Sequence, residues 1–223
     1  MEVTPAGSEP LGVFDAVLFD FDGTLANSYE SMMTAYRIFA EEYGVGLDKV
    51  RSFTGMPSES LARALLPAEQ AVAGGERIDE LESSNTDGVV ALPGALAALE
   101  AIPATRWAIA TSCTHRLITA RLRAAGLPTP SVLVPCDSVA NGKPAPDSFL
   151  LAAKLLGFEP SRCLVLEDAP AGVAGARAAG CAVGGVLTGH TAEELGADWH
   201  VETLADLRFD VADDGVSVFR VGG

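Results

Sequence analysis

From residue 106 onward, the chain alternates between short apolar runs and longer stretches whose apolar positions recur at helical spacing. Runs of the first kind predict buried strands, and stretches of the second kind predict helices that bury one face. The expected strands are 106–111, 131–135, 162–167 and 182–188, and the expected helices between them are 114–126, 147–157 and 171–180. This alternation is typical of an α/β protein, with a mostly parallel sheet flanked by helices. A short strand at 198–201 and a hairpin that turns at Asp214 and Gly215 are expected to complete the fold.

The first strand of this core is expected much earlier, at the apolar run 16–19, which leaves a long gap before the strand at 106. A βα crossover needs about 30 residues in all, and a long structureless loop inside a compact domain is uncommon. The gap instead carries helical patterns over 30–44, 58–66 and, more weakly, 69–81, where Gly74 and Gly75 break the spacing, and a further helix begins near Pro93.

We therefore expect an α/β core domain of residues 1–29 and 92–223 and an inserted α-helical cap domain of residues 30–91. A cap of this kind could close over the core and exclude water from a site there. Residues 1–12, which are polar and contain Pro5 and Pro10, are expected to form a loose tail without a function.

Composition indicates a compact, acidic protein. Of the 223 residues, 48% are apolar, which is enough for a sizeable core. Thirty Asp and Glu against fifteen Lys and Arg give a formal net charge of −15, which argues against nucleic acid or an anionic membrane as a partner. An anionic substrate would therefore need a local positive site.

The cysteines and the N-terminal residues bear on the cellular compartment in which the protein is expected. Four widely spaced cysteines form no CxxC pair, so we expect buried thiols in a reducing environment rather than disulfides or a zinc site. The first residues lack a basic region followed by an apolar one, and no apolar run approaches the ~20 residues of a membrane span. The sequence predicts a soluble, cytoplasmic protein, as a monomer or a dimer.

Two carboxylates, Asp20 and Asp22, follow the strand 16–19 directly. Side chains two apart on an extended segment point to the same side, so both acids can face one small space and still differ in role. An exposed turn rich in Asp and Gly is the plain alternative. A calcium loop is excluded by spacing, because its fifth and twelfth positions, counted from Asp20, would be Thr24 and Ser31.

Polar residues also follow the later strands, and open parallel sheets place their sites beyond the carboxyl ends of the strands. These residues are Thr111 and Ser112 at the end of the strand 106–111, Lys143 in the loop NGKP, and Glu167 and Asp168, which follow the four apolar residues 163–166 at the end of the strand 162–167. The hydroxyls and free backbone N–H groups could hold phosphate oxygens, the ammonium could neutralise a phosphoryl group, and the acids could hold a cation. Each has a plain alternative: capping of a helix, or a solvated surface charge.

Taken together, DFDGTLANS (20–28), ATS (110–112), GKPAPDSF (142–149) and LEDAPAG (166–172) resemble the four motifs of the haloacid dehalogenase superfamily, in its phosphatase and phosphomutase branch. The resemblance implies a Rossmann-like core with an inserted helical cap. It also implies that Asp20 is a nucleophile that forms an aspartyl phosphate, and that Asp22 is the general acid and then the base.

The same resemblance assigns the remaining site residues. Mg²⁺ would be held by the Asp20 carboxylate, the backbone carbonyl of Asp22 and Asp168, with Glu167 contacting it directly or through water. The phosphoryl oxygens would be bound by Thr111, Ser112 and Lys143.

The motif segments are most similar to those of members that hydrolyse small sugar or polyol phosphates, such as 2-deoxyglucose-6-phosphatases and glycerol-3-phosphatases. The expected substrate loop of the cap, SFTGMPSES (52–60), contains Gly55 as a substrate-binding position and offers hydroxyls but no cation. A second anionic group is therefore not expected to be held by this loop. Arg51, Arg63 and Arg77 could still hold one, although each is expected to be an exposed helix residue.

Two alternatives remain. A β-phosphoglucomutase-like phosphomutase matches all four motifs, but such mutases carry a His after the first motif where this chain has Met32. A signalling or binding protein that accepts a phosphoryl group on Asp20, like a response-regulator receiver, would be shorter and would have no cap. Phosphate release over many turnovers would separate an enzyme from such a receiver.

Overall fold

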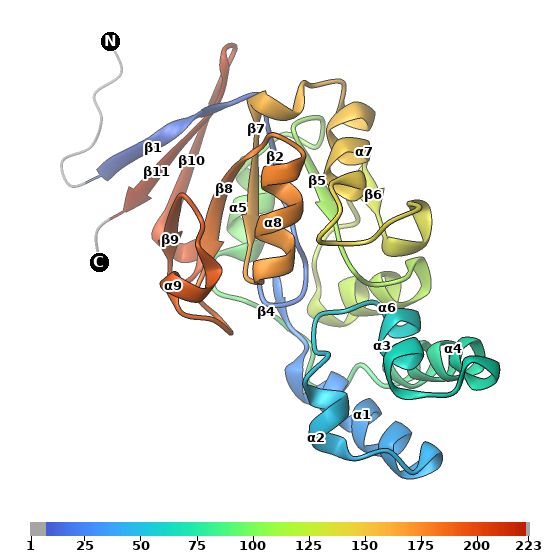
Figure 1. Cartoon of the computed structure of the whole chain (residues 1–223). Coiled ribbons are helices and arrows are strands. Elements are labelled where there is room, and N and C mark those ends of the chain that lie inside the picture. The colour runs from blue at the N-terminus through green and yellow to red at the C-terminus, as the bar shows by residue number, and fades with distance from the viewer. Residues whose placement is uncertain (1–7, 222–223) are drawn as a thin grey trace.

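The computed structural model describes residues 8–221. Its central strands are β2 (Ala16–Phe19), β5 (Trp107–Ala110), β6 (Leu133–Val134), β7 (Cys163–Glu167), β8 (Ala182–Val186) and β9 (Trp199–Val201). They form a six-stranded sheet in the order β6-β5-β2-β7-β8-β9 (Figure 1), and each neighbouring pair is parallel. The predicted α/β class with a parallel sheet is confirmed.

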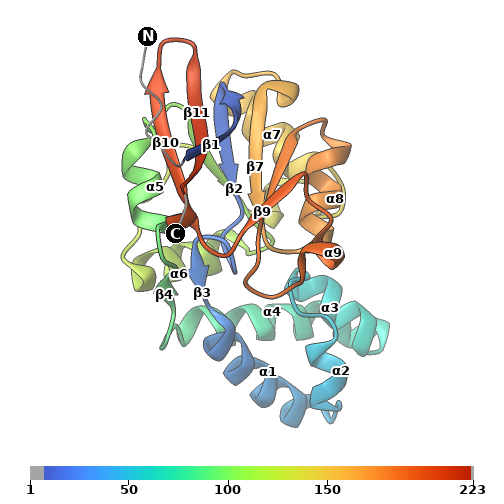
Figure 2. The same cartoon turned by 90° about the vertical axis from the view of Figure 1, so that its left-hand side faces the viewer.

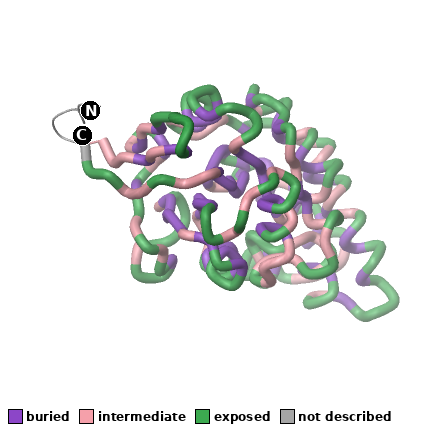
Figure 3. Tube along the Cα trace, turned by 90° about the horizontal axis from the view of Figure 1, so that it is seen from above, coloured by how far each residue is buried: buried purple, intermediate pink, exposed green. Residues whose placement is uncertain are grey.

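Helices cover both faces of this sheet. They are α5 (Ala95–Ala101), α6 (His115–Ala125), α7 (Asp147–Leu156), α8 (Pro170–Ala178) and α9 (Ala192–Leu195). Because side chains alternate along a strand, Val17 packs on the side of α5 and α6, and Leu18 packs on the side of α7 and α8. Seen from above in Figure 3, buried stretches run through the middle of the molecule and exposed stretches lie around them.

A second group of helices, which we call the helical unit, lies beyond one end of the sheet (Figure 2). It consists of α1 (Tyr29–Tyr43), α2 (Leu47–Arg51), α3 (Ser58–Leu65) and α4 (Ala68–Ser84). It has an apolar cluster of its own, in which Phe39, Leu61 and Ile78 are fully buried. Two chain connections join it to the core, and they pair as the short antiparallel strands β3 (Ala26–Asn27) and β4 (Val90–Ala91). None of the helices within residues 8–221 combines the length and low polarity needed to cross a membrane.

The two glycines expected to break the helix at 69–81 do not break it, because α4 runs through both. They lie where α4 and α3 approach closely. A Cβ on Gly75 would be 2.8 Å from the backbone Cα of Glu59, and one on Gly74 would be 2.4 Å from Leu66 Cδ1. Close packing between helices, rather than a loop, therefore accounts for this pair.

The expected loose tail at 1–12 is wrong for the part that the structure describes, and residues 1–7 lie outside it. Residues Ser8–Phe14 form β1, which pairs with β11 (Gly215–Val221), and β10 (Leu207–Ala212) pairs with the other edge of β11. The pairing of β1 with β11 shifts its register between Pro10 and Gly12. Strands tolerate proline and glycine at irregularities of this kind. The predicted C-terminal hairpin is present as β10 and β11. The strand that pairs with it, β1, lies mostly in the segment that the sequence pattern predicted to be a loose tail.

Replacing Gly94 with Ala is expected to destabilise the core. Gly94 has a φ of +81°, and a Cβ there would lie 2.1 Å from the backbone nitrogen of Ala205, between α5 and the chain that enters β10. We expect a loss of about 3 kcal/mol in the free energy of unfolding and a Tm lower by about 10 °C, measured by circular dichroism.

The matched control is Gly157→Ala, because Gly157 has a φ of +84° with no atom within 4 Å of its would-be Cβ. It should show the cost of the backbone conformation alone, about 1 kcal/mol. Equal shifts of Tm in the two variants would mean that the contact with Ala205 contributes nothing.

Candidate active site

The carboxyl ends of β5, β2 and β7 lie side by side, because these strands are neighbours in the sheet and run parallel. Asp20 follows β2, Thr111 follows β5, and Glu167 ends β7. The Asp20 backbone N–H donates to Leu166 O at 2.9 Å, so the ladder continues to the first acid and fixes its position. The topology therefore brings together the strand ends that the sequence singled out.

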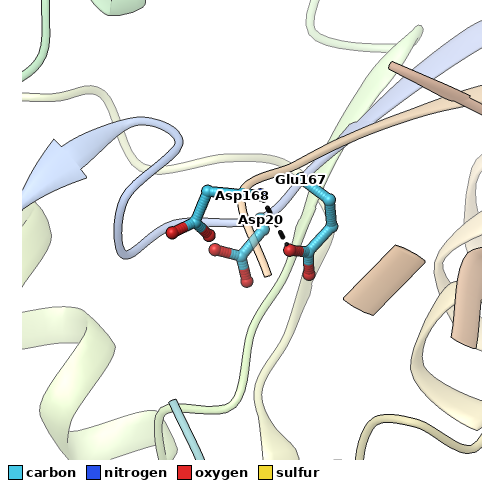
Figure 4. A group of neighbouring side chains, drawn as sticks. All are labelled: Asp20, Glu167 and Asp168. Atoms are coloured by element: carbon cyan, nitrogen blue, oxygen red, sulfur yellow. Dashed lines mark hydrogen bonds between the residues drawn. The ribbon is translucent and has the colours of Figure 1, made fainter. Parts of the chain in front are cut away.

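Three acids meet at this edge, and Figure 4 shows them facing one another. Asp20, Glu167 and Asp168 each place one carboxylate oxygen within 4.8 Å of the others. Glu167 Oε2 accepts hydrogen bonds from the backbone N–H groups of Asp168 and Ala169, both at 2.9 Å. These bonds hold the buried Glu167 carboxylate in place at the start of α8.

Lys143 lies among these acids. Its Nζ is 2.5 Å from Asp20 Oδ1 and 2.7 Å from Glu167 Oε1, and its side chain is only 5% exposed. It also lies 5.0 Å from the centre of the Phe149 ring. Burial alone would lower the pKa of Lys143, but the charges of Asp20 and Glu167 more than offset this effect and raise it. Lys143 is therefore a fixed ammonium group rather than the solvated surface charge of the alternative interpretation.

The site carries more negative than positive charge. Burial raises the pKa of Asp20, with Lys143 opposing this rise and Glu167 adding to it. Burial likewise raises the pKa of Asp168, and the charges of Glu167 and Asp20 add to the rise. Three carboxylates against one ammonium form an oxygen-rich set that suits Mg²⁺, because a hard divalent cation offsets this repulsion. The residues present therefore fit the metal that the motifs imply.

Asp22 is held apart from these acids. Its Oδ1 accepts from Ser28 Oγ at 2.6 Å, and its Oδ2 accepts from Arg121 Nη1 at 2.8 Å and from Cys113 Sγ at 2.9 Å. Its side chain is 30% exposed, in contrast to the buried Asp20. The two acids of the first motif thus have different surroundings, and Asp22 does not join the three-acid group as the expectation of one shared space implied. Its role as acid and base stays a prediction.

Thr111 and Ser112 lie between β5 and α6. Thr114, not either of them, caps α6, because its side chain accepts from the backbone N–H of Leu117. The buried Thr111 Oγ1 accepts from the backbone N–H of Cys113 at 3.1 Å, and Ser112 is half-buried. Helix capping therefore does not explain these two residues, and their role in binding phosphate stays a prediction.

The loop between α2 and α3 reaches toward the Lys143 loop, since a Cβ on Gly142 would be 3.5 Å from Pro57 Cγ. Gly55 lies in the exposed part of this turn with a φ of +86°, and its contact with substrate stays a prediction. Arg63 pairs with Glu59, and Arg77 pairs with Glu42 and Glu80. Arg51 donates to the hydroxyl of Tyr29 at 3.2 Å.

Several residues at the site were missed by sequence reasoning. Thr188 Oγ1 donates to the Gly23 carbonyl at 2.6 Å and lies 3.5 Å from Asp168 Oδ2. Ser28 had no signal beyond its place in the first motif. Arg121 had a signal in the sequence, because it falls on the apolar face of α6 with Leu117 and Leu122. An arginine without a partner on that buried face would be costly.

Replacing Gly172 with Ala is expected to damage the site without unfolding the protein. A Cβ on Gly172 would lie 1.6 Å from Glu167 Oε1, the atom that Lys143 binds. Alanine favours a helix by about 1 kcal/mol over glycine, so α8 should persist while Glu167 and Lys143 shift. We expect kcat for phosphate release to fall about tenfold or more. An unchanged kcat would show that Glu167 can move without consequence, and a matching fall in Tm would point to misfolding.

The comparisons with known proteins agree with this geometry. A family model described as haloacid dehalogenase-like hydrolase matches residues 17–186. Hexitol phosphatase A of Escherichia coli (strain K12) is 40% identical over 172 residues, which cover 74% of this chain and 80% of that protein. Validoxylamine A 7'-phosphate phosphatase of Streptomyces hygroscopicus subsp. limoneus is 32% identical over 211 residues, which cover 88% and 97%.

Solved structures give the same result. A hydrolase from Pseudomonas syringae superposes with a TM-score of 0.78 and 28% sequence identity, over 86% of this chain and 95% of that chain. The match of the family model begins at Val17 in β2, ends with β8, and includes β5, β7 and the acids of the site. The chain therefore belongs to the haloacid dehalogenase-like hydrolase family, as its four motifs predicted.

Proposed function

We propose that this chain is a magnesium-dependent phosphatase that transfers the phosphoryl group of a small sugar or polyol phosphate to water. The observation that carries the proposal is the meeting of Asp20, Lys143 and two further acids at one sheet edge. A nucleophilic carboxylate, a fixed ammonium and an acidic cation site are the parts that phosphoryl transfer needs.

In this mechanism, a carboxylate oxygen of Asp20 attacks the phosphorus atom, and the bond between phosphorus and the sugar oxygen breaks. Asp22 donates a proton to that leaving oxygen, and the product alcohol departs. Asp22 then takes a proton from a water molecule as the water attacks the aspartyl phosphate, which releases inorganic phosphate and restores Asp20.

The other residues bind and orient the phosphoryl group. Lys143 would hold one phosphoryl oxygen, and the hydroxyl of Ser112 and the backbone N–H groups after β5 would hold others. Asp20, Asp168, Glu167 and the Asp22 carbonyl would hold Mg²⁺, which supplies charge neutralisation for the phosphoryl oxygens.

We further propose that residues 30–91 act as a cap domain on a core of residues 1–29 and 92–223. The separate apolar cluster of α1–α4 and the paired connections β3 and β4 support this division. The approach of Pro57 to Gly142 supports a cap that touches the site. A cytoplasmic location is supported by the four free thiols Cys113, Cys136, Cys163 and Cys181.

The substrate class follows from the charges of the helical unit. Arg63 and Arg77 are occupied by carboxylates of their own unit, and Arg51 donates to the Tyr29 hydroxyl. The turn at 52–57 offers no cation. A substrate with one phosphate and a neutral polyol part therefore fits better than a bisphosphate. The relatives named as hexitol phosphatase and as validoxylamine A 7'-phosphate phosphatase support the same class.

The test is phosphate release from a panel of hexitol, hexose, glycerol and nucleoside phosphates, with and without Mg²⁺. We expect many turnovers, with the highest kcat/KM for a sugar or polyol monophosphate. An Asp20→Asn preparation measures contaminating phosphatases. A single labelling event per molecule would indicate a receiver-like protein, and isomerisation of a sugar phosphate that requires catalytic sugar bisphosphate would indicate a mutase. The buried Met32 cannot replace the mutase histidine in proton transfer, which favours the hydrolase.

A further inference from the structure

Arg121 joins the core to the helical unit. It lies on α6, its side chain is 3% exposed, and its two terminal nitrogens bind carboxylates from different parts of the fold. Nη1 is 2.8 Å from Asp22 Oδ2, and Nη2 is 2.8 Å from Glu82 Oε1. Glu82 lies in the last turn of α4, and α4 and α6 lie side by side in Figures 1 and 2.

The three groups are energetically coupled. Glu82 is only 5% exposed, so neither it nor Arg121 has water to replace a lost partner. Removing one partner of a buried ion pair strands the other charge, which costs several kcal/mol. Two carboxylates share one guanidinium group, so a movement of Glu82 alters how firmly Arg121 holds Asp22.

Glu82 is also placed where it must move if the helical unit moves. Two residues beyond it, α4 ends at Ser84, and the chain returns to the core through β4, which pairs with β3. Ser28, which binds the other oxygen of Asp22, follows β3 directly in the second connection. Each oxygen of Asp22 is therefore bound by a group at the junction between the core and the helical unit. Ser28 lies in one of the two connections, and Arg121 binds Glu82 near the other.

We propose that Arg121 is a positioning residue that transmits the docking of the helical unit, through Glu82, to the orientation of the Asp22 carboxyl group. This inference builds on the proposed function, in which Asp22 is the proton donor and acceptor. With the helical unit docked as in this structure, Glu82 fixes the guanidinium group, and the guanidinium group fixes the orientation of the Asp22 carboxyl group. When the helical unit swings away, Glu82 leaves, and Asp22 loses its fixed orientation.

The test compares two leaving groups in the variants Glu82→Gln and Arg121→Lys. An alkyl phosphate such as glycerol phosphate needs a proton on its leaving oxygen, whereas p-nitrophenolate leaves without one. We expect kcat for the alkyl phosphate to fall about tenfold or more, which is the range of a misplaced general acid. The KM should stay within about twofold, because binding groups are unchanged. The first-turnover release of p-nitrophenolate, measured by stopped flow, should stay within about twofold of the unaltered protein, since Asp20 attacks without help from Asp22.

The matched control is Asp79→Asn, which removes the charge from another hydrogen bond between α4 and the start of α6, the one that Thr114 Oγ1 donates to Asp79, without touching Arg121. It should leave the ratio between the two substrates unchanged. An equal fall for both leaving groups in Glu82→Gln, or a substrate ratio that changes as much in Asp79→Asn, would overturn the proposal, because either would indicate a structural role. No change in either variant would overturn it too. Failure of the proposed function is distinguishable, because the unaltered protein would then turn over neither substrate.

Discussion

Asp20→Asn is expected to abolish phosphate release. The amide keeps the shape of the side chain and can still accept a hydrogen bond from Lys143, which lies 2.5 Å from Asp20 Oδ1. It cannot attack phosphorus, so the first chemical step has no nucleophile. We expect kcat for the best sugar or polyol phosphate to fall by about 10³-fold or more, measured as Mg²⁺-dependent release of inorganic phosphate.

The matched variant is Asp22→Asn, which keeps the nucleophile and removes the proton donor. With p-nitrophenyl phosphate, Asp22→Asn should still release about one equivalent of p-nitrophenolate and retain a phosphoryl group on Asp20, detectable by mass spectrometry. Asp20→Asn should show neither event. Both variants should still fold, because neither change creates a cavity and each buried cation keeps a second carboxylate, Glu167 for Lys143 and Glu82 for Arg121. Residual activity of Asp20→Asn above about a few per cent would exclude the assignment of the nucleophile.

The site could be located from sequence because its residues lie at strand ends, and topology then places those ends together. Four apolar residues before Asp20 and four before Glu167 predict two buried strands, and parallel neighbours must end at the same edge. Two pieces of information were therefore enough to predict that Asp20, Lys143, Glu167 and Asp168 lie close together. They are the positions of the strands along the chain and the motif that contains Lys143. The same reasoning found the helical insertion, because the gap after residue 29 is too long for a crossover.

Other contacts depend on geometry that no local pattern records. Strand β1 contains Pro10 and Gly12 and becomes a strand only because β11, some 200 residues later, offers it an edge. Gly75 weakens a helix by propensity, yet it allows α3 to approach α4. The partner of Arg121 on α4 could not be predicted either, since the pairing depends on how the helical unit docks. Tertiary contact decided each of these cases against local preference.

Removal of Mg²⁺ is expected to reduce turnover almost to zero. Asp20, Glu167 and Asp168 lie around a single ammonium group, and a phosphoryl dianion must approach them. Two like charges ~4 Å apart repel by several kcal/mol at an intermediate dielectric, so attack by Asp20 is unfavourable while this charge is not offset. Protein dialysed against a chelator should recover activity when Mg²⁺ is added back. Binding can be measured without turnover, because a cation that binds only the folded state raises Tm as its concentration rises.

Asp168→Asn is the matched variant for this prediction, because it removes one carboxylate from the acid group and leaves Asp20 and Lys143 in contact. It should need about tenfold or more Mg²⁺ for half-maximal activity, which corresponds to at least about 1.4 kcal/mol of lost binding free energy. Its Tm should also rise less with added Mg²⁺. Full activity of the unaltered protein in chelator would contradict the prediction, because Lys143 alone would then offset the charge of three acids and a phosphoryl group. An unchanged Mg²⁺ requirement in Asp168→Asn would place the cation elsewhere and remove Asp168 from the proposed ligands.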